Sequence, residues 1–461
     1  MIVELLIIGL GYVGLPLAYE TARAGANVTG YDTNPGRVSM LNAGMSPVDD
    51  LSDNDIARMQ ADGFSAVSEL PDIKPDVIVI CVPTPLSEDD GPDLTAVRKA
   101  AGAAALMLRP GTLVSLESTT YPGTTEEVVR PILELASGLT AGEDFHLVFS
   151  PERIDPGNPE FGLANTPKVV GGVTRACAEA GADFYGKICR QVVIAKSTRE
   201  AEMAKLLENT YRHVNIALVN EMAVFCHEMD IDLWDAIECA STKPFGFQAF
   251  RPGPGVGGHC IPIDPNYLSY KVRQLGYPFR FVELAQEINR RMPAYVVTRA
   301  AEMLNDAGMP LKGSLVALMG VTYKPDIADQ RESPAPQVAR KLMARGAALR
   351  YHDPYVQGWT VDGERIGFWN PAEDHADLVI LLQAHSSYDL QTLTDSAPML
   401  LDTTGRVPRE RPHVETFLVP GAVALTRRPR CGGPRQAAGA RGTRQACARL
   451  AAGQGKEPRT R

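Results

Sequence analysis

The chain has 461 residues, of which 44% are hydrophobic and 22% charged, so we expect an ordinary globular protein of two or three domains. Its eight cysteines include no CxxC pair, which argues against a zinc site and against the disulfide framework of a secreted protein. The apolar N-terminus lacks a basic leader, and no apolar run reaches the ~18 residues that span a membrane. We therefore expect a cytoplasmic protein with no membrane partner.

The formal net charge of −9 is unevenly distributed. Residues 427–461 contain nine Arg, one Lys and one Glu and carry +9, which leaves −18 for the residues before them. Because this region is rich in Gly, Ala and Arg and lacks apolar periodicity, the sequence predicts that residues 426–461 form a basic disordered tail. Such a tail can contact nucleic acid or an anionic membrane, but a solvated extension is the better interpretation, and no nucleic-acid partner is expected.

Residues 1–195 alternate short apolar runs with helical stretches. Most of the runs are apolar on both faces, as strands of a parallel sheet covered by helices should be. We predict a doubly wound α/β domain here. The predicted strands are VELLIIG (3–9), NVTGYD (27–32), DVIVICVPTP (76–85), TLVSLEST (112–119), HLVFSPE (146–152), KVVGG (168–172) and QVVIA (191–195).

The loop GLGYVGLPLA, after the first predicted strand, carries Gly9, Gly11 and Gly14 in a GxGxxG pattern and opens a helix. Such glycines allow a tight turn and a close approach of the backbone to a pyrophosphate, whose charge the helix N-terminus stabilises. Asp32 ends the next predicted strand, 18 residues after Gly14, where a carboxylate accepts hydrogen bonds from the adenosine ribose and repels a 2′-phosphate. Arg37 nearby can accept a 2′-phosphate, but the pattern favours NAD over NADP.

Residues 197–230 contain neither Gly nor Pro and predict a long central helix. The helix opens with Ser197 and Glu200 at the spacing of a capping box. A helix that is apolar on several faces needs more cover than one domain provides, so we expect a homodimer built on this helix. The apolar residues that lie over more than one face include Ile216, Leu218, Val219 and Met222.

One cysteine, Cys260, lies among four glycines and three prolines in the segment GPGVGGHCIPIDPNYLSYK, residues 253–271. Beside a hydride acceptor, a thiolate can add to an aldehyde, the adduct can lose a hydride, and water can hydrolyse the resulting thioester. A lone cysteine is more often an inert packing residue, but the glycines and Asp264, four residues later, favour a nucleophile here. We interpret five other cysteines as packing residues: Cys81, Cys177, Cys189, Cys226 and Cys239.

A second α/β pattern follows, in SLVALMGVTYK (314–324), ALRYHDP (348–354), DLVILLQAH (377–385) and PMLLDTTG (398–405). The sequence therefore predicts an α/β fold in which two Rossmann-like doubly wound domains are joined by a long central helix.

Several separated motifs make the chain similar to the UDP-glucose/GDP-mannose dehydrogenase family of nucleotide-sugar dehydrogenases. The motifs are GLGYVGLPLA, VPTP, ESTTYPGTTEE, SPERIDPGN, AEMAKLLENTYRHVNIALVNE, GVGGHCIPIDP, GVTYKPDIADQRESPA and DTTG. The resemblance covers roughly residues 1–425 and implies oxidation of a sugar CH2OH to a carboxylate with two NAD+ and no metal. It implies an NAD-binding domain at 1–195, a central helical dimerisation and substrate domain at 196–295, and a UDP-sugar-binding domain at 296–425.

The resemblance assigns a cofactor pocket to separate parts of the chain. Ser118 and Thr119, at a strand end, match residues that contact nicotinamide and a catalytic water. Arg331, in DQRES, resembles an arginine that reaches the cofactor from the second α/β domain. The implied cofactor-binding residues are Gly9, Gly11, Tyr12, Val13, Gly14, Asp32, Arg37, Thr84, Ser118, Thr119 and Arg331.

The resemblance also implies catalytic and substrate-binding residues. Cys260 matches the thiol nucleophile, Glu152 a general base for thioester hydrolysis, and Lys205 a lysine that steadies the oxyanion. Asn209 lies on the same helix face as Lys205, and Asp264 matches a carboxylate that supports water activation or proton transfer. The implied catalytic residues are Cys260, Lys205, Asp264, Glu152, Asn209 and Thr119. The implied substrate-binding residues are Glu152, Arg153, Lys205, Asn209, Arg251, Gly257 and Lys324.

Each assignment has a plainer alternative. Lys205 can be a solvated helix charge, and Glu152 can belong to a salt bridge at a strand end. His259 is better interpreted as a supporting residue than as an acid or base. A two-electron dehydrogenase of the 6-phosphogluconate or hydroxyacyl type would need neither Cys260 nor the second α/β domain, and a non-catalytic NAD-binding regulatory protein would be free to lose Lys205.

Two departures bear on the sugar. UDP-glucose dehydrogenases usually carry a second acidic residue where this chain has Pro156, and one branch has a lysine where this chain has Ile263. The motifs look more like the branch that acts on UDP-N-acetylhexosamines for surface polysaccharide precursors, with UDP-N-acetylglucosamine first. UDP-N-acetylmannosamine and UDP-glucose are the alternatives.

Overall fold

The structure is a computed structural model, in which the described residues are 3–48, 50–87, 91–155, 158, 160–258, 261–407 and 413–416. The predicted basic tail, together with His259, Cys260 and Pro156, lies outside the described residues.

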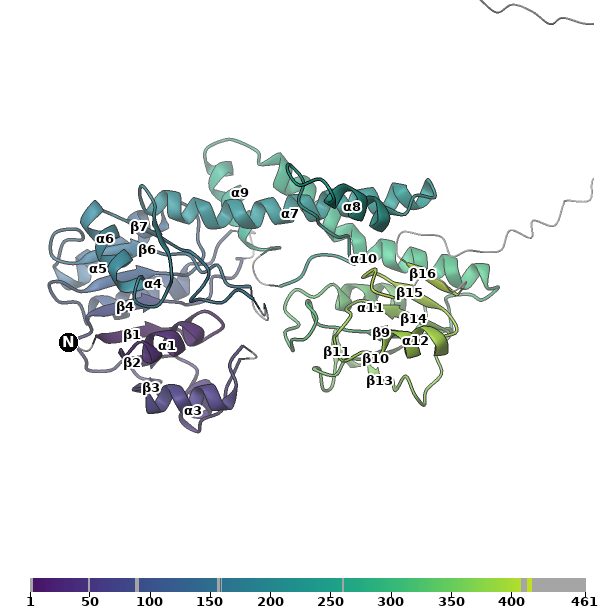
Figure 1. Ribbon diagram of the computed structural model, residues 1–461, viewed down its shortest axis with the longest axis horizontal. Coiled ribbons are helices and arrows are strands. Elements are labelled where there is room, and N and C mark those ends of the chain that lie inside the picture. Colours follow the sequence, from purple (N-terminus) through teal and green to yellow (C-terminus); the bar gives the residue numbers. More distant parts are fainter. Residues whose placement is uncertain are drawn as a thin grey trace, which may run out of the picture. The chain divides into compact units, whose positions relative to one another are not determined.

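The first sheet has eight strands in the order β3-β2-β1-β4-β5-β6-β7-β8 (Figure 1). Its neighbours pair in parallel except β6 and β7, which are antiparallel. The short strand β3 was not predicted, because its exposed and buried residues alternate over only four positions. The strands are β1 (Glu4–Ile8), β2 (Asn27–Tyr31), β3 (Phe64–Val67), β4 (Val77–Ile80), β5 (Leu113–Leu116), β6 (His146–Phe149), β7 (Lys168–Gly172) and β8 (Val192–Ile194).

Helices cover both faces of this sheet, so strand residues of either parity are buried. On β1, Leu5 and Ile7 belong to one apolar cluster and Leu6 and Ile8 to another. The first cluster takes in α1 (Gly14–Arg23), α2 (Pro35–Asn42), α3 (Asp53–Ala61) and α6 (Arg175–Tyr185). The second takes in α4 (Thr95–Ala105), the π-helical turn η1 (Thr125–Val129) and α5 (Arg130–Ser137). This two-sided cover explains why most of the strands read as continuous apolar runs.

The long central helix is α7 (Thr198–Glu228), and Ser197, the residue predicted to open it, is its N-cap. The hydroxyl of Ser197 accepts a hydrogen bond from the backbone N–H of Arg199 and donates one to the carboxylate of Glu200. The remaining helices of this part are α8 (Leu233–Ser241), α9 (Asp264–Gln274) and α10 (Arg280–Asp306). Helix α10 runs through residues 295 and 296, between which the predicted domain boundary falls.

The second sheet has six parallel strands in the order β13-β10-β9-β14-β15-β16. Its two faces are again both covered, because Val316 and Leu318 of β9 join one apolar cluster and Ala317 and Met319 another. The elements are β9 (Leu315–Met319), α11 (Ala335–Ala344), β10 (Ala348–His352), the antiparallel pair β11 (Thr360–Val361) and β12 (Glu364–Arg365), β13 (Gly367–Phe368), β14 (Leu378–Leu381), α12 (Leu390–Ser396), β15 (Leu400–Asp402) and β16 (Val414–Thr416).

Helix α7 belongs to the cores of both sheets. Ala201, near its start, packs in a cluster of the first sheet, and Ala223 and Cys226, near its end, pack with β9 and β14 of the second. The predicted fold class, two doubly wound α/β domains with a long helix between them, is confirmed. No helix in the described ranges is long and apolar enough to cross a membrane.

Candidate active site

The three glycines after β1 each meet a different environment. Gly9 has φ +98°, and a Cβ there would lie 2.7 Å from the carbonyl oxygen of Cys81. A Cβ on Gly14 would lie 1.9 Å from the carbonyl oxygen of Gly9, so the start of α1 packs directly on the turn. A Cβ on Gly11 would have no heavy atom within 4 Å, so the backbone there is open to an approaching group. Turn, approach and packing are the three glycine roles of a dinucleotide-binding loop, and the loop therefore fits NAD.

Asp32 follows β2 and turns its carboxylate toward this loop. Its Oδ2 accepts a hydrogen bond from Leu10 N at 2.9 Å, and its Oδ1 accepts one from Asn34 N at 2.9 Å. The guanidinium of Arg37 lies 2.8 Å from Oδ2. The predicted cofactor residues Asp32 and Arg37 are thus ion-paired to each other beside the glycine loop.

The ends of β4 and β5 bring Thr84, Ser118 and Thr119 together. Ser118 Oγ donates to the carbonyl of Val82 at 2.7 Å, and Thr84 Oγ1 donates to the carbonyl of Thr119 at 2.9 Å. The hydroxyl of Tyr267, on α9, donates to the carbonyl of Thr84. The strand ends and α9 are therefore linked by direct hydrogen bonds.

Arg331 reaches the glycine loop from the segment between β9 and α11. Its guanidinium makes paired hydrogen bonds to Asp329, at 2.6–3.0 Å, and lies 4.8 Å from the centroid of the Tyr12 ring. Its carbonyl accepts a hydrogen bond from Gly258 N at 3.0 Å. Tyr12, Val13 and Gly14 are partly or fully buried. Arg331 thus connects the cofactor loop with the segment that precedes residue 260.

The predicted catalytic side chains on α7 face two other predicted residues. Lys205 is 8% exposed, and its Nζ donates to the carbonyl of Glu152 at 2.5 Å. Asn209 Nδ2 donates to Asp264 Oδ2 at 2.5 Å. Burial raises the pKa of Asp264 to about 7, although Lys205 and Asn209 act in the opposite direction. A carboxyl group with this pKa can exchange a proton near neutral pH.

Glu152 presents one bound and one open oxygen. Its Oε1 accepts hydrogen bonds from the backbone N–H groups of Arg153 and Ile154, both at 2.6 Å. Its Oε2 is buried without a hydrogen-bond partner among the described residues. The side chain of Arg153 turns to Glu208, 2.7 Å away, and to the carbonyl of Pro167. An oriented carboxylate with a free oxygen can accept a proton from a water molecule.

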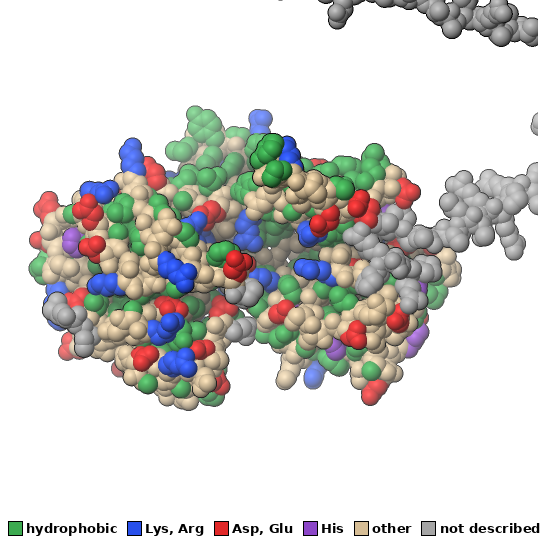
Figure 2. Space-filling view, viewed as in Figure 1, with side chains coloured by type: hydrophobic (Ala, Val, Ile, Leu, Met, Phe, Trp, Pro, Cys, Tyr) green, Lys and Arg blue, Asp and Glu red, His purple; other side chains and the backbone are tan. Residues whose placement is uncertain are grey.

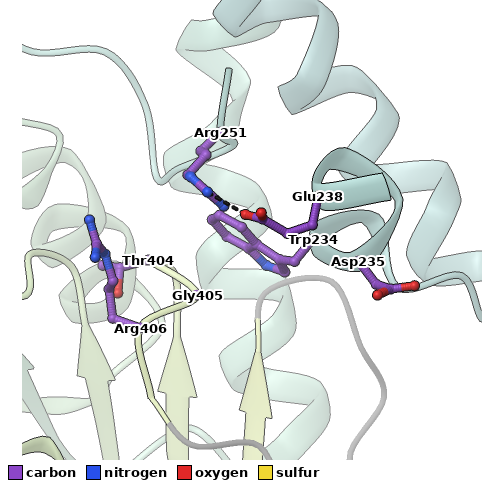
Figure 3. A pocket seen from close by; sticks show the side chains of 7 residues that line it. All are labelled: Trp234, Asp235, Glu238, Arg251, Thr404, Gly405 and Arg406. Carbon is purple, nitrogen blue, oxygen red and sulfur yellow. Dashed lines mark hydrogen bonds and ion pairs between the residues drawn. The ribbon is translucent and has the colours of Figure 1, made fainter. Parts of the chain in front are cut away.

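Two predicted substrate residues have other partners. Lys324 pairs with Asp155 of the SPERIDPGN segment at 2.8 Å. Arg251 pairs with Glu238 and lies over the ring of Trp234, its guanidinium carbon 5.7 Å from the ring centroid. Arg251 lines a pocket of about 310 Å³ between α8 and the loop after β15 (Figure 3), whose other lining residues are Trp234, Asp235, Glu238, Thr404, Gly405 and Arg406.

Gly257 and Gly258 pack closely against the second α/β domain. A Cβ on Gly257 would lie 2.6 Å from Tyr323 Cβ, and one on Gly258, where φ is +82°, would lie 2.7 Å from the Tyr323 ring. Only glycine fits here without a shift of the aromatic side chain. Cys260 itself lies outside the described residues, between Gly258 and Asp264.

Among the described residues, Cys81, Cys177, Cys189 and Cys226 are buried, as predicted, but Cys239 is exposed on α8. Its interpretation as a packing residue was wrong, because α8 buries Leu233, Trp234 and Ile237 and turns Cys239 to its outer side. In the described part of the chain, no group of three or more His, Cys, Asp or Glu residues is arranged to hold a metal ion.

Three residues at the edge where β5 and β6 end were not predicted. Glu117, Lys168 and Tyr185 are all buried and connected to one another. One feature of the sequence could have indicated this contact, because Glu117 and Lys168 adjoin runs that are otherwise apolar. Charged residues are rarely buried in proteins unless they are paired.

A glycine loop fitted to NAD, together with a separate cluster of a buried acid, a lysine and an amide, indicates an NAD-dependent dehydrogenase. Models of one protein family match most of the length of this chain. The NAD binding domain of the UDP-glucose/GDP-mannose dehydrogenase family matches residues 3–189, its central domain 199–291 and its UDP binding domain 317–408. The chain belongs to the UDP-glucose/GDP-mannose dehydrogenase family and is an NAD-dependent nucleotide-sugar dehydrogenase.

Individual relatives resemble the chain over most of their length. It is 38% identical to a UDP-N-acetyl-D-glucosamine 6-dehydrogenase of Pseudomonas aeruginosa, over 83% of this chain and 90% of that protein. It is 34% identical to a UDP-N-acetyl-D-mannosamine dehydrogenase of Pyrococcus horikoshii, over 83% of this chain and 89% of that protein. A solved structure of a UDP-D-ManNAc dehydrogenase from Pyrococcus horikoshii matches with a TM-score of 0.82 and 31% identity, over 90% of this chain and 99% of that one.

Proposed function

We propose that this protein oxidises the C6 alcohol of UDP-N-acetylglucosamine to a uronic acid in two hydride transfers, through a thioester on Cys260. The observation that carries the proposal is the cluster of Lys205, Asn209, Asp264 and Glu152, because Asp264 begins α9 only four residues after Cys260. The relatives bear on the sugar: one with 38% identity is named for UDP-N-acetyl-D-glucosamine. UDP-N-acetylmannosamine is the second candidate, since a relative with 34% identity carries that name.

Each step uses a residue of this cluster. Two molecules of NAD+, bound one after the other, would each accept one hydride, one for each oxidation. Asp264, poised near neutral pH, takes the proton of the C6 hydroxyl while the carbon gives up a hydride. The Cys260 thiolate then adds to the aldehyde carbon, and the Lys205 ammonium stabilises the negative oxygen that forms. Loss of a second hydride from that carbon leaves the thioester.

Hydrolysis of the thioester is assigned to Glu152. The open Oε2 accepts a proton from water, the water oxygen bonds to the acyl carbon, and the carbon–sulfur bond breaks to release the thiolate. The Cys260 segment is glycine-rich, so substrate and nicotinamide can come close to the sulfur.

Trapping the acyl-enzyme tests this proposal. Cys260→Ala should abolish uronic acid formation even where some aldehyde forms, and Cys260→Ser should accumulate an ester, because an oxygen ester hydrolyses more slowly than a thioester. Intact-protein mass spectrometry after incubation with NAD+ and UDP-N-acetylglucosamine should show the added acyl mass on Cys260→Ser. If Cys260→Ala still yields two NADH and one uronic acid per sugar at a near-normal rate, covalent catalysis is wrong for this protein.

We also propose a homodimer built on α7. Its exposed side includes Leu207, Tyr211, Leu218 and Phe225, which are 64%, 46%, 53% and 45% exposed. Figure 2 shows hydrophobic side chains gathered over α9 and the neighbouring parts of α7 and α8, where Leu275 and Tyr277 are each 67% exposed. Exposed apolar side chains in this number mark an interface more often than a solvated surface.

A further inference from the structure

A buried ion pair outside the proposed reaction, Lys168 with Glu117, places its ammonium next to Glu152. Lys168 is 3% exposed and Glu117 is 1% exposed. The Nζ of Lys168 lies 2.9 Å from Glu117 Oε2 and 3.6 Å from Glu152 Oε2. The ammonium therefore donates a hydrogen bond to one carboxylate and attracts the other without hydrogen-bonding to it.

The reversed strand β7 explains why these residues meet. In a fully parallel sheet, the first residue of β7 would lie at the edge opposite to the ends of β5 and β6. Because β7 is antiparallel to β6, pairing Val148 with Gly172 and Phe149 with Gly171, the same register continued for three residues sets Glu152 opposite Lys168. The hydroxyl of Ser150, which donates to the carbonyl of Val169 at 2.8 Å, keeps this register past the end of β6.

Glu117 is held in place on its other side as well. Its Oε1 accepts a hydrogen bond from the hydroxyl of Tyr185 at 2.5 Å, and that hydroxyl lies 2.8 Å from Ser115 Oγ. Burial raises the pKa of Glu117. Burial alone would lower the pKa of Lys168, but Glu117 and Glu152 together raise it. One firmly protonated ammonium thus lies between two carboxylates, where an unpaired charge would be costly.

We propose that Lys168 is a positioning residue for Glu152, and that Glu117 keeps the ammonium from hydrogen-bonding to the oxygen that takes the proton. The ammonium, 3.6 Å away, attracts Oε2 of Glu152 and orients it. The shorter contact of Lys168 to Glu117 leaves the lone pairs of Oε2 available to water. This inference rests on the proposed role of Glu152 in thioester hydrolysis.

Several ionisable groups face this site from the elements packed around Glu152, and the pH dependence reports on all of them. They are Cys81 after β4, Glu117 after β5, Lys168 on β7, Tyr185 on α6, Cys189 after α6, Lys205 on α7 and the adjacent Arg153.

The test is the pH dependence of deacylation in full-length variants. Acyl-enzyme formed with NAD+ and UDP-N-acetylglucosamine is jumped to pH values between about 5 and 9, and its decay is followed by intact-protein mass spectrometry. Lys168→Met removes the cation and should move the acid-side midpoint upward by about one pH unit. Glu117→Gln frees the ammonium to bond to Glu152 and should move that midpoint downward by about one unit and lower the maximal rate.

If the pH midpoints of the two variants move in opposite directions, Lys168 and Glu117 position Glu152. A purely structural role would lower the deacylation rate of both variants without moving either midpoint. The double variant Lys168→Met/Glu117→Gln should fall between wild type and Lys168→Met, and it replaces the single variant if Lys168→Met does not fold. Asp402→Asn, a fully buried carboxylate of the second sheet, is the control for lost stability and should leave the midpoint unchanged.

Glu152→Gln separates the two proposals. If Glu152→Gln hydrolyses its acyl-enzyme at the wild-type rate, the assigned role of Glu152 fails. If Glu152→Gln traps the acyl-enzyme while Lys168→Met and Glu117→Gln keep the wild-type midpoint, the positioning proposal alone is overturned.

Discussion

Asn209 and Asp264 form a buried hydrogen bond, with 2.5 Å between Nδ2 and Oδ2, that joins α7 to the first residue of α9. A helix N-terminus stabilises a negative charge, and so does the nearby Lys205. Burial nevertheless outweighs both and raises the pKa of Asp264 to about 7. The protein therefore keeps a carboxyl group whose ionised form is disfavoured by burial at a place where a base of moderate strength is useful.

Asp264→Asn should stabilise the folded state above neutral pH and lower activity. A carboxyl group whose pKa is raised on folding stabilises the protein below its unfolded value of 3.8, and this contribution is lost as pH rises toward about 7. The difference corresponds to roughly 4 kcal/mol of unfolding free energy at its limit. Urea titrations at pH 4 and pH 8 should show the variant gaining stability relative to wild type only at the higher pH. An equal effect at both values would contradict the assignment.

Asp32→Ala should weaken the preference for NAD+ over NADP+. The change removes the carboxylate beside the ribose and releases Arg37, now 2.8 Å from Asp32, to meet a 2′-phosphate. The ratio of kcat/KM for the two cofactors measures the effect, and a loss of tenfold or more in preference corresponds to about 1.4 kcal/mol. Arg37→Ala is the matched control and should not improve the use of NADP+. Equal use of both cofactors by the wild type would contradict the assignment of Asp32 as the residue that selects NAD+.

Leu207→Glu should shift the proposed homodimer toward monomer. The side chain is 64% exposed on α7, so the substitution costs little in a monomer but would bury an unpaired charge in a dimer. Sedimentation velocity at micromolar concentration should show dimer for wild type and monomer for the variant. Leu135→Glu, at a 90% exposed position on α5, controls for added charge. A monomeric wild type would refute the dimer.

Deletion of residues 427–461 should leave turnover and melting temperature nearly unchanged. The segment carries nine Arg but little apolar sequence, so it cannot bury enough surface to contribute to a core. Steady-state kinetics and thermal unfolding of the shortened chain, measured at equal ionic strength, provide the check. A large loss of either property would show that the tail packs on the rest of the protein or enters the site.

The parts of the site that sequence predicts well are those made by neighbouring residues. The Gly9–Gly14 loop and the N-cap of α7 at Ser197 depend on local geometry, which the residue types determine directly. The Glu117–Lys168 contact could not be predicted in this way, because it joins residues 51 positions apart and depends on the direction of β7. The motif KVVGG indicates a buried strand, but nothing in one lysine, two valines and two glycines says in which direction the strand runs.

Tertiary packing also determined where sequence patterns misled. Cys239 lies in a helix with many apolar residues, but its position is outside the stripe of Leu233, Trp234 and Ile237 that α8 buries. Arg251 lies close to the glycine-rich Cys260 segment in sequence, yet its side chain turns to Glu238 and Trp234. For a long, flexible side chain, its position in the sequence does not determine which residues it contacts.

The uninterrupted helix α7 has a consequence for how the chain unfolds. Because Ala201 is part of one apolar core and Ala223 of the other, melting either core would leave half of a single helix without its packing surface. The cost of ending the helix midway couples the two halves, so the described chain should lose its structure in one cooperative transition rather than domain by domain.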